Sequence, residues 1–415
     1  MKSEPNYRLN KIHIVLPLFM ILMVMVANTV IVPVLKESVK DRIDEKAVGW
    51  FLSLSFLGSV LFSPLSGWLS DRSGNRKIWI LVTAFISSAC YFYLSVFPSP
   101  VPFFVTRFIE GAAAAFTLSL LLALMGDFEA ELRRPYLMGL AGMMLALGGG
   151  LGFPLGALGK SNPKLPFLAA AITMLIVGFL CFFIRDANRL SKTVQVKAGE
   201  FFSLMKSQWL LVIPLLFIFI DRVTGGFASS SLNLHLRETV GLDAAQTGRL
   251  LGYVFLPMGL LAYPVTLFMN RYGILLSVLL GSTVYGVALL FLGLTQSSAM
   301  LSLILVVAGV GAALMFVPTL ALTSRLAPSS LRATAVGSYM GVGSLGFLIG
   351  PLLSVYLKSW LNQYYDAIDS FAILAAIFGS LELLMVLAVL PFVQKISLLI
   401  QQKQEKESQD FNQSK

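Results

Sequence analysis

Twelve apolar runs, each of about 20 residues or more, leave few folds open to this chain. They cover about 13–35, 47–69, 78–97, 102–126, 136–158 and 165–184, then 209–233, 246–269, 273–294, 299–323, 335–357 and 370–394. In a bilayer, only helices and closed barrels satisfy their own backbone hydrogen bonds. With 57% hydrophobic and 13% charged residues, the composition excludes an ordinary soluble domain. We therefore expect an all-α integral membrane protein with twelve transmembrane helices.

A polar stretch divides these runs into two sets of six. We expect an N-terminal half over 1–184, a cytoplasmic linker over 185–207, a C-terminal half over 208–398 and a polar cytoplasmic tail over 399–415. Because the number of spans is even, both termini lie on the same side of the membrane.

The two halves carry traces of a duplication. Four residues of the first half recur in the second at one offset, 332 − 134 = 198: Arg134, Gly139, Gly148 and Gly152 correspond to Arg332, Gly337, Gly346 and Gly350. Transporters are often built from such repeats. The repeat predicts two pseudo-symmetric six-helix bundles.

The net charge of +10 comes from basic residues in the short segments between apolar runs, not from one stripe that would bind nucleic acid. The positive-inside rule then predicts that the termini and the segment 67–77 are cytoplasmic. We expect a multi-pass protein of the plasma (cell inner) membrane. One cluster is an exception, because its basic residues fall on the outer side and alternate with acids: Lys36, Glu37, Lys40, Asp41, Arg42, Asp44, Glu45 and Lys46.

The segment from Gly67 to Lys77 is expected to form a tight, charged loop at the membrane surface. It resembles the loop between helices two and three of the major facilitator superfamily, G-x-L-x-D-R-x-G-R-[RK]-[RK], with Asn75 in place of the first closing basic residue. The resemblance implies a twelve-helix secondary transporter, closest to the drug:proton antiporter branch. It also implies alternating access, in which two halves rock about a central site.

The same resemblance implies a conformational latch at this loop. Its members would be Gly67, Asp71, Arg72, Gly74, Arg76 and, from the end of the fourth span, Asp127. Asp127 would lie against Arg76 and close the inner side until protonation or substrate shifts the balance. A solvated charge cluster that only orients the chain is the alternative.

Arg107 and Glu110 are the clearest charges inside a span. They are three residues apart, so they share a helix face and can pair. We expect either a functional polar pair in a water-filled cavity or a structural ion pair. With Gly111 they resemble the family's R-x-x-[QE]-G motif, which implies proton coupling.

Other polar candidates lie in the first, seventh, eighth and twelfth spans. Asp221 and Arg222 are near mid-membrane and about 100° apart around a helix, so both are not expected to face one spot; Asp221 is a proton or substrate acid, or balances a nearby charge. Asn28 binds substrate or makes a contact between helices. Glu382, on a helix that is peripheral in this family, is a weaker candidate, and the role of Arg249 stays open.

The fifth and eleventh spans are expected to bend or slide at small residues. The candidate hinge positions are Gly139, Gly148, Gly152, Pro154, Gly156, Gly337, Gly346, Gly350 and Pro351. Four of the glycines resemble the antiporter motif G-x8-G-x3-G-P-x-x-G, although Phe153 stands where proline is expected. The alternative is that these glycines only allow the helices to pack closely.

We expect a monomeric transporter, not an enzyme, that exports small amphipathic compounds in exchange for protons. It would need a small-molecule substrate, the lipid bilayer and a proton gradient but no cofactor, because the chain has no phosphate-binding loop and its two cysteines have no metal-ligand spacing. Uptake of a nutrient or organic anion through Arg107 and Arg222 is one alternative. A lipid translocase or membrane sensor on the same fold is another.

Overall fold

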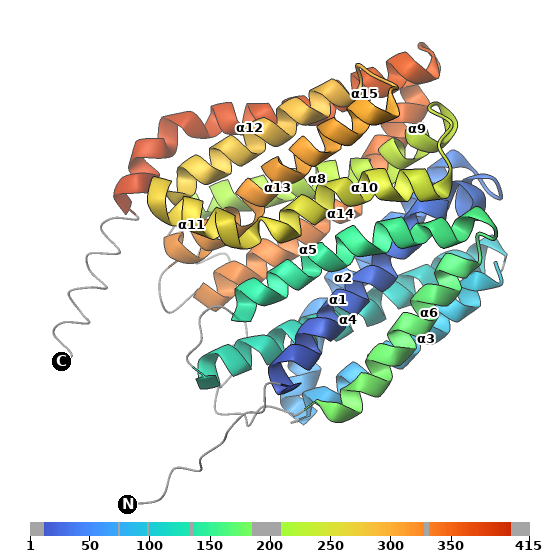
Figure 1. Ribbon diagram of the computed structural model, residues 1–415. Helices are drawn as coiled ribbons and strands as arrows, with labels where there is room; N and C mark the ends of the chain where they lie inside the picture. Colours follow the sequence, from blue (N-terminus) through green and yellow to red (C-terminus); the bar gives the residue numbers. More distant parts are fainter. Residues whose placement is uncertain are drawn as a thin grey trace, which may run out of the picture.

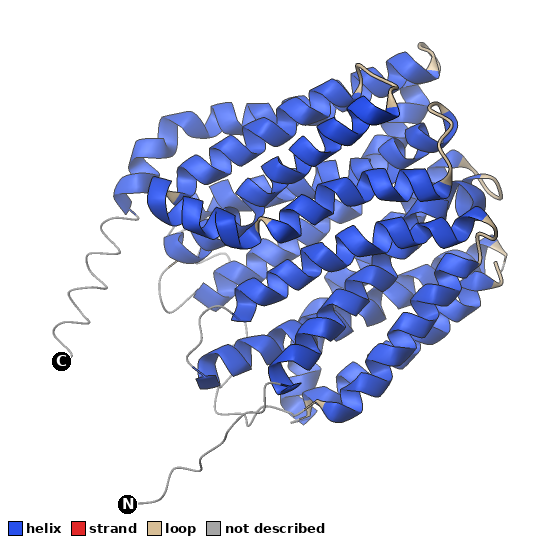
Figure 2. Ribbon diagram, viewed as in Figure 1, coloured by secondary structure: helices blue, strands red, loops and turns tan. Residues whose placement is uncertain are grey.

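Helices make up almost all of the part of the chain that the computed structural model describes, residues 12–73, 75–97, 99–132, 137–184, 209–327 and 332–399 (Figure 2). The helices are α1 (Ile12–Val30), α2 (Glu45–Ser73), α3 (Arg76–Ser95), α4 (Pro100–Leu132), α5 (Leu137–Leu155), α6 (Leu165–Leu180), α8 (Val212–Phe227), α9 (Asn233–Glu238), α10 (Ala244–Leu260), α11 (Ala262–Tyr272), α12 (Ile274–Leu292), α13 (Ser298–Leu326), α14 (Arg332–Leu361) and α15 (Ala367–Val389). Short 3-10 or π segments adjoin them at Val32–Val34, Lys36–Lys40, Gly156–Lys160, Cys181–Phe183, Trp209–Leu211, Ala228–Leu232 and Leu390–Phe392.

Eleven described helical segments are long and apolar enough to cross a membrane, and α10 with α11 makes a twelfth if the bent pair is one span. The predicted twelve-helix membrane fold is therefore confirmed. The two members of the pair meet at an angle of 53°. Pro264 accounts for the break, because it has no N–H group with which to continue the helical ladder to the carbonyl of Leu260.

The described helices form two groups, one from α1 to α6 and one from α8 to α15 (Figure 1). In the first, α1 packs on α5 and α6, α2 on α4, and α3 on α4 and α6. In the second, α8 packs on α14, and α12 lies between α13 and α15. The predicted linker and all but the first residue of the predicted tail fall outside the described residues.

The main contacts between the halves are related to each other by the sequence repeat. They join α5 to α10 and α2 to α14. The offset of 198 residues carries α2 onto α10 and α11, and α5 onto α14, since 45 + 198 = 243 and 137 + 198 = 335. Each contact is thus the image of the other under exchange of the halves.

The segment predicted as a loop over 67–77 is mostly helical. Helix α2 continues to Ser73, and α3 begins at Arg76. Asn75, the residue that departs from the family pattern, caps α3: its side chain accepts a hydrogen bond from the backbone N–H of Ile78 at 3.1 Å. The connection is thus even shorter than the predicted tight loop over 67–77, because a cap needs only one or two residues between the helices.

Helices α2 and α4 approach each other through glycines. A Cβ atom at Gly111 would overlap the backbone oxygen of Ser55, and one at Gly58 would lie 2.7 Å from the backbone nitrogen of Ala112. Small residues allow such close packing in membranes. Gly111, the last residue of the motif that begins at Arg107, thus has a packing role.

We expect Gly111→Ala to lower the thermal unfolding temperature of the detergent-purified protein. The added methyl group meets backbone atoms that cannot turn aside, and overpacking of this kind costs on the order of 1–3 kcal/mol. Gly139→Ala is the matched control, because no described atom lies within 4 Å of its Cβ position. Equal unfolding temperatures for the two variants would contradict the assigned role of Gly111.

Candidate functional site

Four ion pairs join the halves at one end of the bundle, which we call the closed face. They link Glu37 to Arg237, Lys40 to Glu238, Glu45 to Lys358 and Lys160 to Asp243. In each pair one residue comes from the first half and one from the second. We call this set the ion-pair gate.

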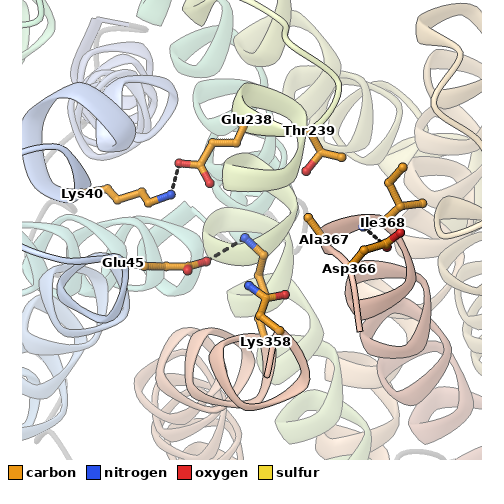
Figure 3. Close-up of a pocket in the computed structure, with 9 residues that line it drawn as sticks. Lys40, Glu45, Glu238, Thr239, Lys358, Asp366, Ala367 and Ile368 are labelled. Carbon is orange, nitrogen blue, oxygen red and sulfur yellow. Dashed lines mark hydrogen bonds and ion pairs between the residues drawn. The ribbon is translucent and has the colours of Figure 1, made fainter. Parts of the chain in front are cut away.

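Lys358 is the most enclosed member of the gate. Its side chain is only 4% exposed, and its Nζ lies 2.7 Å from Oε1 of Glu45 (Figure 3). Trp50 supports the same region, because its Nε1 donates a hydrogen bond to the hydroxyl of Tyr356 in the other half at 3.1 Å. The charges in this region are thus largely neutralised across the interface.

A pocket of about 460 Å³ opens among the gate residues, and Lys40, Glu45, Glu238, Lys358 and Asp366 are part of its lining (Figure 3). The dashed pairs in the figure show that both of its lysines already have carboxylate partners. We interpret the pocket as space within the gate, since its charges are committed to each other.

Asp243 serves both the gate and the start of α10. Its carboxylate accepts a hydrogen bond from the backbone N–H of Gln246 at 2.8 Å, and the side chain of Gln246 accepts one from the N–H of Asp243. Lys160 lies 3.1 Å away. The backbone hydrogen bond from Gln246 and, secondarily, Lys160 hold the pKa of Asp243 below its ordinary value.

The opposite end of the bundle, where α2 meets α3, lacks such close contacts at its glycines, and we call it the open face. Among the described residues, Cβ positions at Gly139 and Gly142 on α5, and at Gly337 and Gly341 on α14, meet no atom within 4 Å. Further along α5, Gly150 packs closely against Leu256 of the other half. The contact between the halves is therefore concentrated toward the closed face.

The other candidate hinge residues form packing contacts in this conformation. Gly148, Gly152 and Gly156 bring α5 against α1 and Pro33, and the repeat places Gly346 and Gly350 against α8 in the same way. Pro154 lies beside Gly252 of α10, and Pro351 beside Gly49 and Gly226. These contacts agree with the alternative that the residues allow close helix packing. Sliding or bending of the helices at these positions stays a prediction.

Arg107 and Glu110 form an ion pair inside the first half. The guanidinium also donates to the backbone oxygen of Phe51 at 3.3 Å and lies over its ring, with 4.7 Å between Cζ and the ring centroid. The two residues are 3% and 0% exposed, so the expected water-filled space does not reach them in this conformation. The aromatic ring of Phe51 and the packing of α2 on α4 exclude water here.

A polar network continues from this pair toward α1 and α3. Ser87 donates a hydrogen bond to Glu110 at 3.4 Å, and Tyr91 lies beside the same carboxyl group. Tyr91 in turn donates to the side-chain oxygen of Asn28 at 2.9 Å. The side chain of Asn28 thus makes an interhelical contact, the second of the two roles expected for it.

Asp221 and Arg222 do meet, contrary to the expectation that neighbours on a helix face different ways. Arg222 Nε lies 3.6 Å from Asp221 Oδ2, because the long arginine side chain reaches back around the helix. The guanidinium also lies between two rings, 5.0 Å from the centroids of both Phe316 and Phe347. Phe347 stacks on Phe56 of the first half, with centroids 4.7 Å apart.

Two further intramembrane charges are placed by the structure. Glu382, expected to be peripheral, is 0% exposed and faces the interior of its half, where its carboxyl group contacts the hydroxyls of Ser282 and Thr224. Arg249, near the start of α10, is exposed.

The predicted latch lies largely outside what the structure describes. Gly67 and Asp71 belong to α2 but their side chains are not described, nor is that of Asp127 on α4, and Gly74 falls between the described ranges. Arg72 is exposed and Arg76 is buried. The contact between Asp127 and Arg76 therefore stays a prediction.

Sequence reasoning missed the ion-pair gate. Its signal was the alternation of acids and bases over 36–46, which was noted only as an exception to the positive-inside rule. The partners at 237, 238 and 358 are about 200 to 300 residues away, and no local pattern links them.

Twelve apolar helices in two repeated halves, closed at one face and holding buried charges, define a membrane transporter. The sequence model of the Major Facilitator Superfamily matches residues 18–224 and 215–409, and the chain belongs to this family. It is a multi-span secondary transporter.

Curated relatives agree with this assignment. An uncharacterized MFS-type transporter of Bacillus subtilis, YqjV, is 23% identical over 319 residues, which cover 73% of this chain and 75% of that protein. Multidrug resistance protein 1 of Bacillus subtilis is 26% identical over 37% of this chain and 40% of its own length. A gentisate transporter of Corynebacterium glutamicum is 31% identical over 26% of this chain and 25% of its own length. The matches to the latter two thus span less than half of either relative.

Solved structures share the fold. The nucleoside transporter NupG superposes with a TM-score of 0.75 at 13% identity and covers 92% of this chain and 98% of its own. A bacterial homologue of the human lysosomal transporter Spinster, in an inward-facing conformation, gives 0.70 at 16% identity over 97% of this chain and 98% of its own.

We expect Arg107→Leu to reduce the yield of folded protein sharply. The change leaves the Glu110 carboxyl buried without its cation, and breaking a buried pair on one side costs about 3–5 kcal/mol. The double variant Arg107→Leu/Glu110→Ala copies the repeat-equivalent residues Leu305 and Ala308, both 1% exposed, and should recover that yield. Size-exclusion profiles and unfolding temperatures measure both effects, and a single variant as stable as wild type would contradict the role of the pair.

Proposed function

We propose that the protein exports small amphipathic compounds in exchange for protons, by alternating access between its two halves. The proposal rests on one observation: the bundle is closed by ion pairs at one end and open at the other, and each half contains a buried acid, Glu110 or Glu382. In this proposal the closed face is extracellular, the open face and both termini are cytoplasmic, and the membrane is the plasma membrane. The conformation described is then the one that takes up substrate from the cytoplasm.

The charge of Arg107 is already compensated by Glu110, and this favours export over uptake of an anion through Arg107. The guanidinium of Arg107 is engaged by Glu110 and Phe51 and is almost fully buried. An anion would have to displace a carboxylate already in place. Similarity to Multidrug resistance protein 1 supports the same choice.

A carrier of organic anions is the second candidate function. Arg222 is 19% exposed at its side chain and lies between aromatic rings beside the interface, so it remains reachable from the space between the halves. A flat anionic compound would find both a cation and apolar ring faces there.

In proteoliposomes that contain a pH-sensitive dye, we expect a lipophilic compound to drive proton movement. The panel comprises lipophilic cations, neutral drugs, sugars and organic anions. Glu110→Gln should abolish this movement because the amide binds no proton, whereas Asp369→Asn, which neutralises an exposed acid at the closed face, should not. Transport of an organic anion that survives Glu110→Gln but is lost in Arg222→Gln would overturn export in favour of the second candidate. A panel in which no compound moves protons would favour a lipid translocase or a sensor.

The gate provides a separate test of alternating access. Glu45→Lys places a second ammonium against the enclosed Lys358, and we expect like-charge repulsion to separate the halves at the closed face. Spin labels at the exposed positions Ser161→Cys and Tyr364→Cys, with Cys90 and Cys181 replaced by serine, report the distance between the halves. The distance should lengthen in the single variant.

The charge swap Glu45→Lys/Lys358→Glu is the matched control, since it restores an ion pair and should restore the short distance. An unchanged distance in Glu45→Lys would show that this pair does not hold the closed face together.

A further inference from the structure

Glu382 is a fully buried acid without a cation partner among the described residues. It lies on α15, and its carboxyl group contacts two hydroxyls: Ser282 Oγ on α12 at 2.6 Å and Thr224 Oγ1 on α8 at 3.3 Å. Glu110, the buried acid of the first half, contacts Ser87 on α3 in the same way but has Arg107 as well. Burial of an uncompensated carboxylate is costly, and the neutral acid avoids that cost.

The hydrogen bonds at Thr224 give an independent reason for a proton on Glu382. The hydroxyl of Thr224 has one proton, and its shortest contact is with the backbone oxygen of Asp221 at 2.8 Å. Once that proton is used, Thr224 Oγ1 can only accept from Glu382. A protonated Glu382 satisfies this contact, whereas a carboxylate would place two acceptors together.

Packing isolates Glu382 toward α12 and toward the closed face. A Cβ atom at Gly286 of α12 would lie 2.9 Å from the Cβ of Glu382 and 3.0 Å from the backbone oxygen of Gly379, so α12 and α15 touch through their backbones. Toward the closed face, Phe227 stacks on Phe378 and on Phe371, with centroids 4.7 and 5.8 Å apart. These rings block a path to the closed face.

A polar route remains in the other direction. Thr224 Oγ1 is 3.5 Å from the hydroxyl of Tyr285, and one turn back on α8 lies Asp221, whose side chain is 16% exposed. The titratable or charged side chains on the helices packed against this region are Asp221 and Arg222 on α8, Tyr285 on α12 and Tyr339 on α14, which lies beside Arg222. The route therefore leads from a buried acid to a partly exposed ion pair.

We propose that Glu382 is a second proton-carrying residue of the transporter and exchanges its proton with the space between the halves through Thr224, Tyr285 and Asp221. The inference rests on the proposed proton coupling and extends it to the second half. In the step, the O–H bond of Glu382 breaks, the proton passes to water in that space, and the electron pair stays on the carboxylate. The carboxylate then attracts Arg222, whose guanidinium contacts the ring of Phe347, and that ring stacks on Phe56 of the first half.

This arrangement connects proton loss to the contact between the halves. Movement of Arg222 toward the new carboxylate would remove its contacts with the rings of Phe316 and Phe347. Because Phe347 stacks on Phe56 of the first half, its ring is a direct link across the interface.

Infrared difference spectroscopy of the purified full-length protein tests the proposal without any transported compound. A protonated carboxyl group has its own C=O band, and we expect wild type to show such a band that disappears at alkaline pH. Glu382→Gln should lose this band, and Asp369→Asn, the matched exposed acid, should retain it. A Glu382→Gln spectrum identical to that of wild type would overturn the proposal.

Deuterium exchange separates a proton route from a purely structural hydrogen bond. On transfer to D₂O the carboxyl band shifts as the proton is replaced, and we expect Thr224→Val to slow this shift several-fold while Glu382 itself is unchanged. Equal exchange rates would exclude Thr224 from the route and overturn the proposal as stated. Since neither measurement depends on substrate, a failed flux assay would count against proton-coupled export and not against protonation of Glu382.

Discussion

Removal of charge from water is the constraint on which this structure depends. Within the membrane, backbone N–H and C=O groups can hydrogen-bond only to one another. Each ionisable side chain there needs a specific partner. Arg107 and Glu110 meet the need with each other, and Asp221 and Arg222 do so with the help of two rings. Glu382 meets it with hydroxyls alone. The buried charges therefore differ in how easily each could change its protonation state.

The repeat explains why the molecule has two unlike ends. Exchange of the halves maps the contact of α5 with α10 onto that of α14 with α2, so both contacts loosen or tighten at the same end. At the closed face both are tight and ion pairs lie across them, whereas toward the open face glycines on α5 and α14 meet no neighbour in the part of the chain that the structure describes. The bend between α10 and α11 adds to this difference, because it turns the end of that span away from the line of α10.

Much of the fold could be predicted from the sequence, because length and apolarity decide whether a segment spans a bilayer. The pairing of Arg107 with Glu110 was equally accessible, since residues three apart on a helix are neighbours. The inward orientation of Glu382 was not, because it depends on how α15 is rotated against α8 and α12. The pairing of Glu45 with Lys358 depends in turn on how the halves meet. The bend at Leu261 had a local signal in Pro264, but tolerated prolines inside α5, α13 and α14 show why proline alone does not predict a break.

The chemistry of the gate suits an interface that must open. The two more exposed pairs of the gate, Lys40 with Glu238 and Lys160 with Asp243, contribute about 0–1 kcal/mol each, so they add little to the stability of the closed face. A shift from 1:99 to 99:1 between two conformations requires about 5.5 kcal/mol of differential binding. A difference in proton affinity between conformations supplies about 1.4 kcal/mol for each unit by which the pKa differs between them. Two acids in separate halves could therefore supply together the free energy that shifts the equilibrium. A single acid would need a much larger change in its pKa to do the same. A buried acid in each half and a gate of separate ion pairs are therefore complementary parts of one conformational switch.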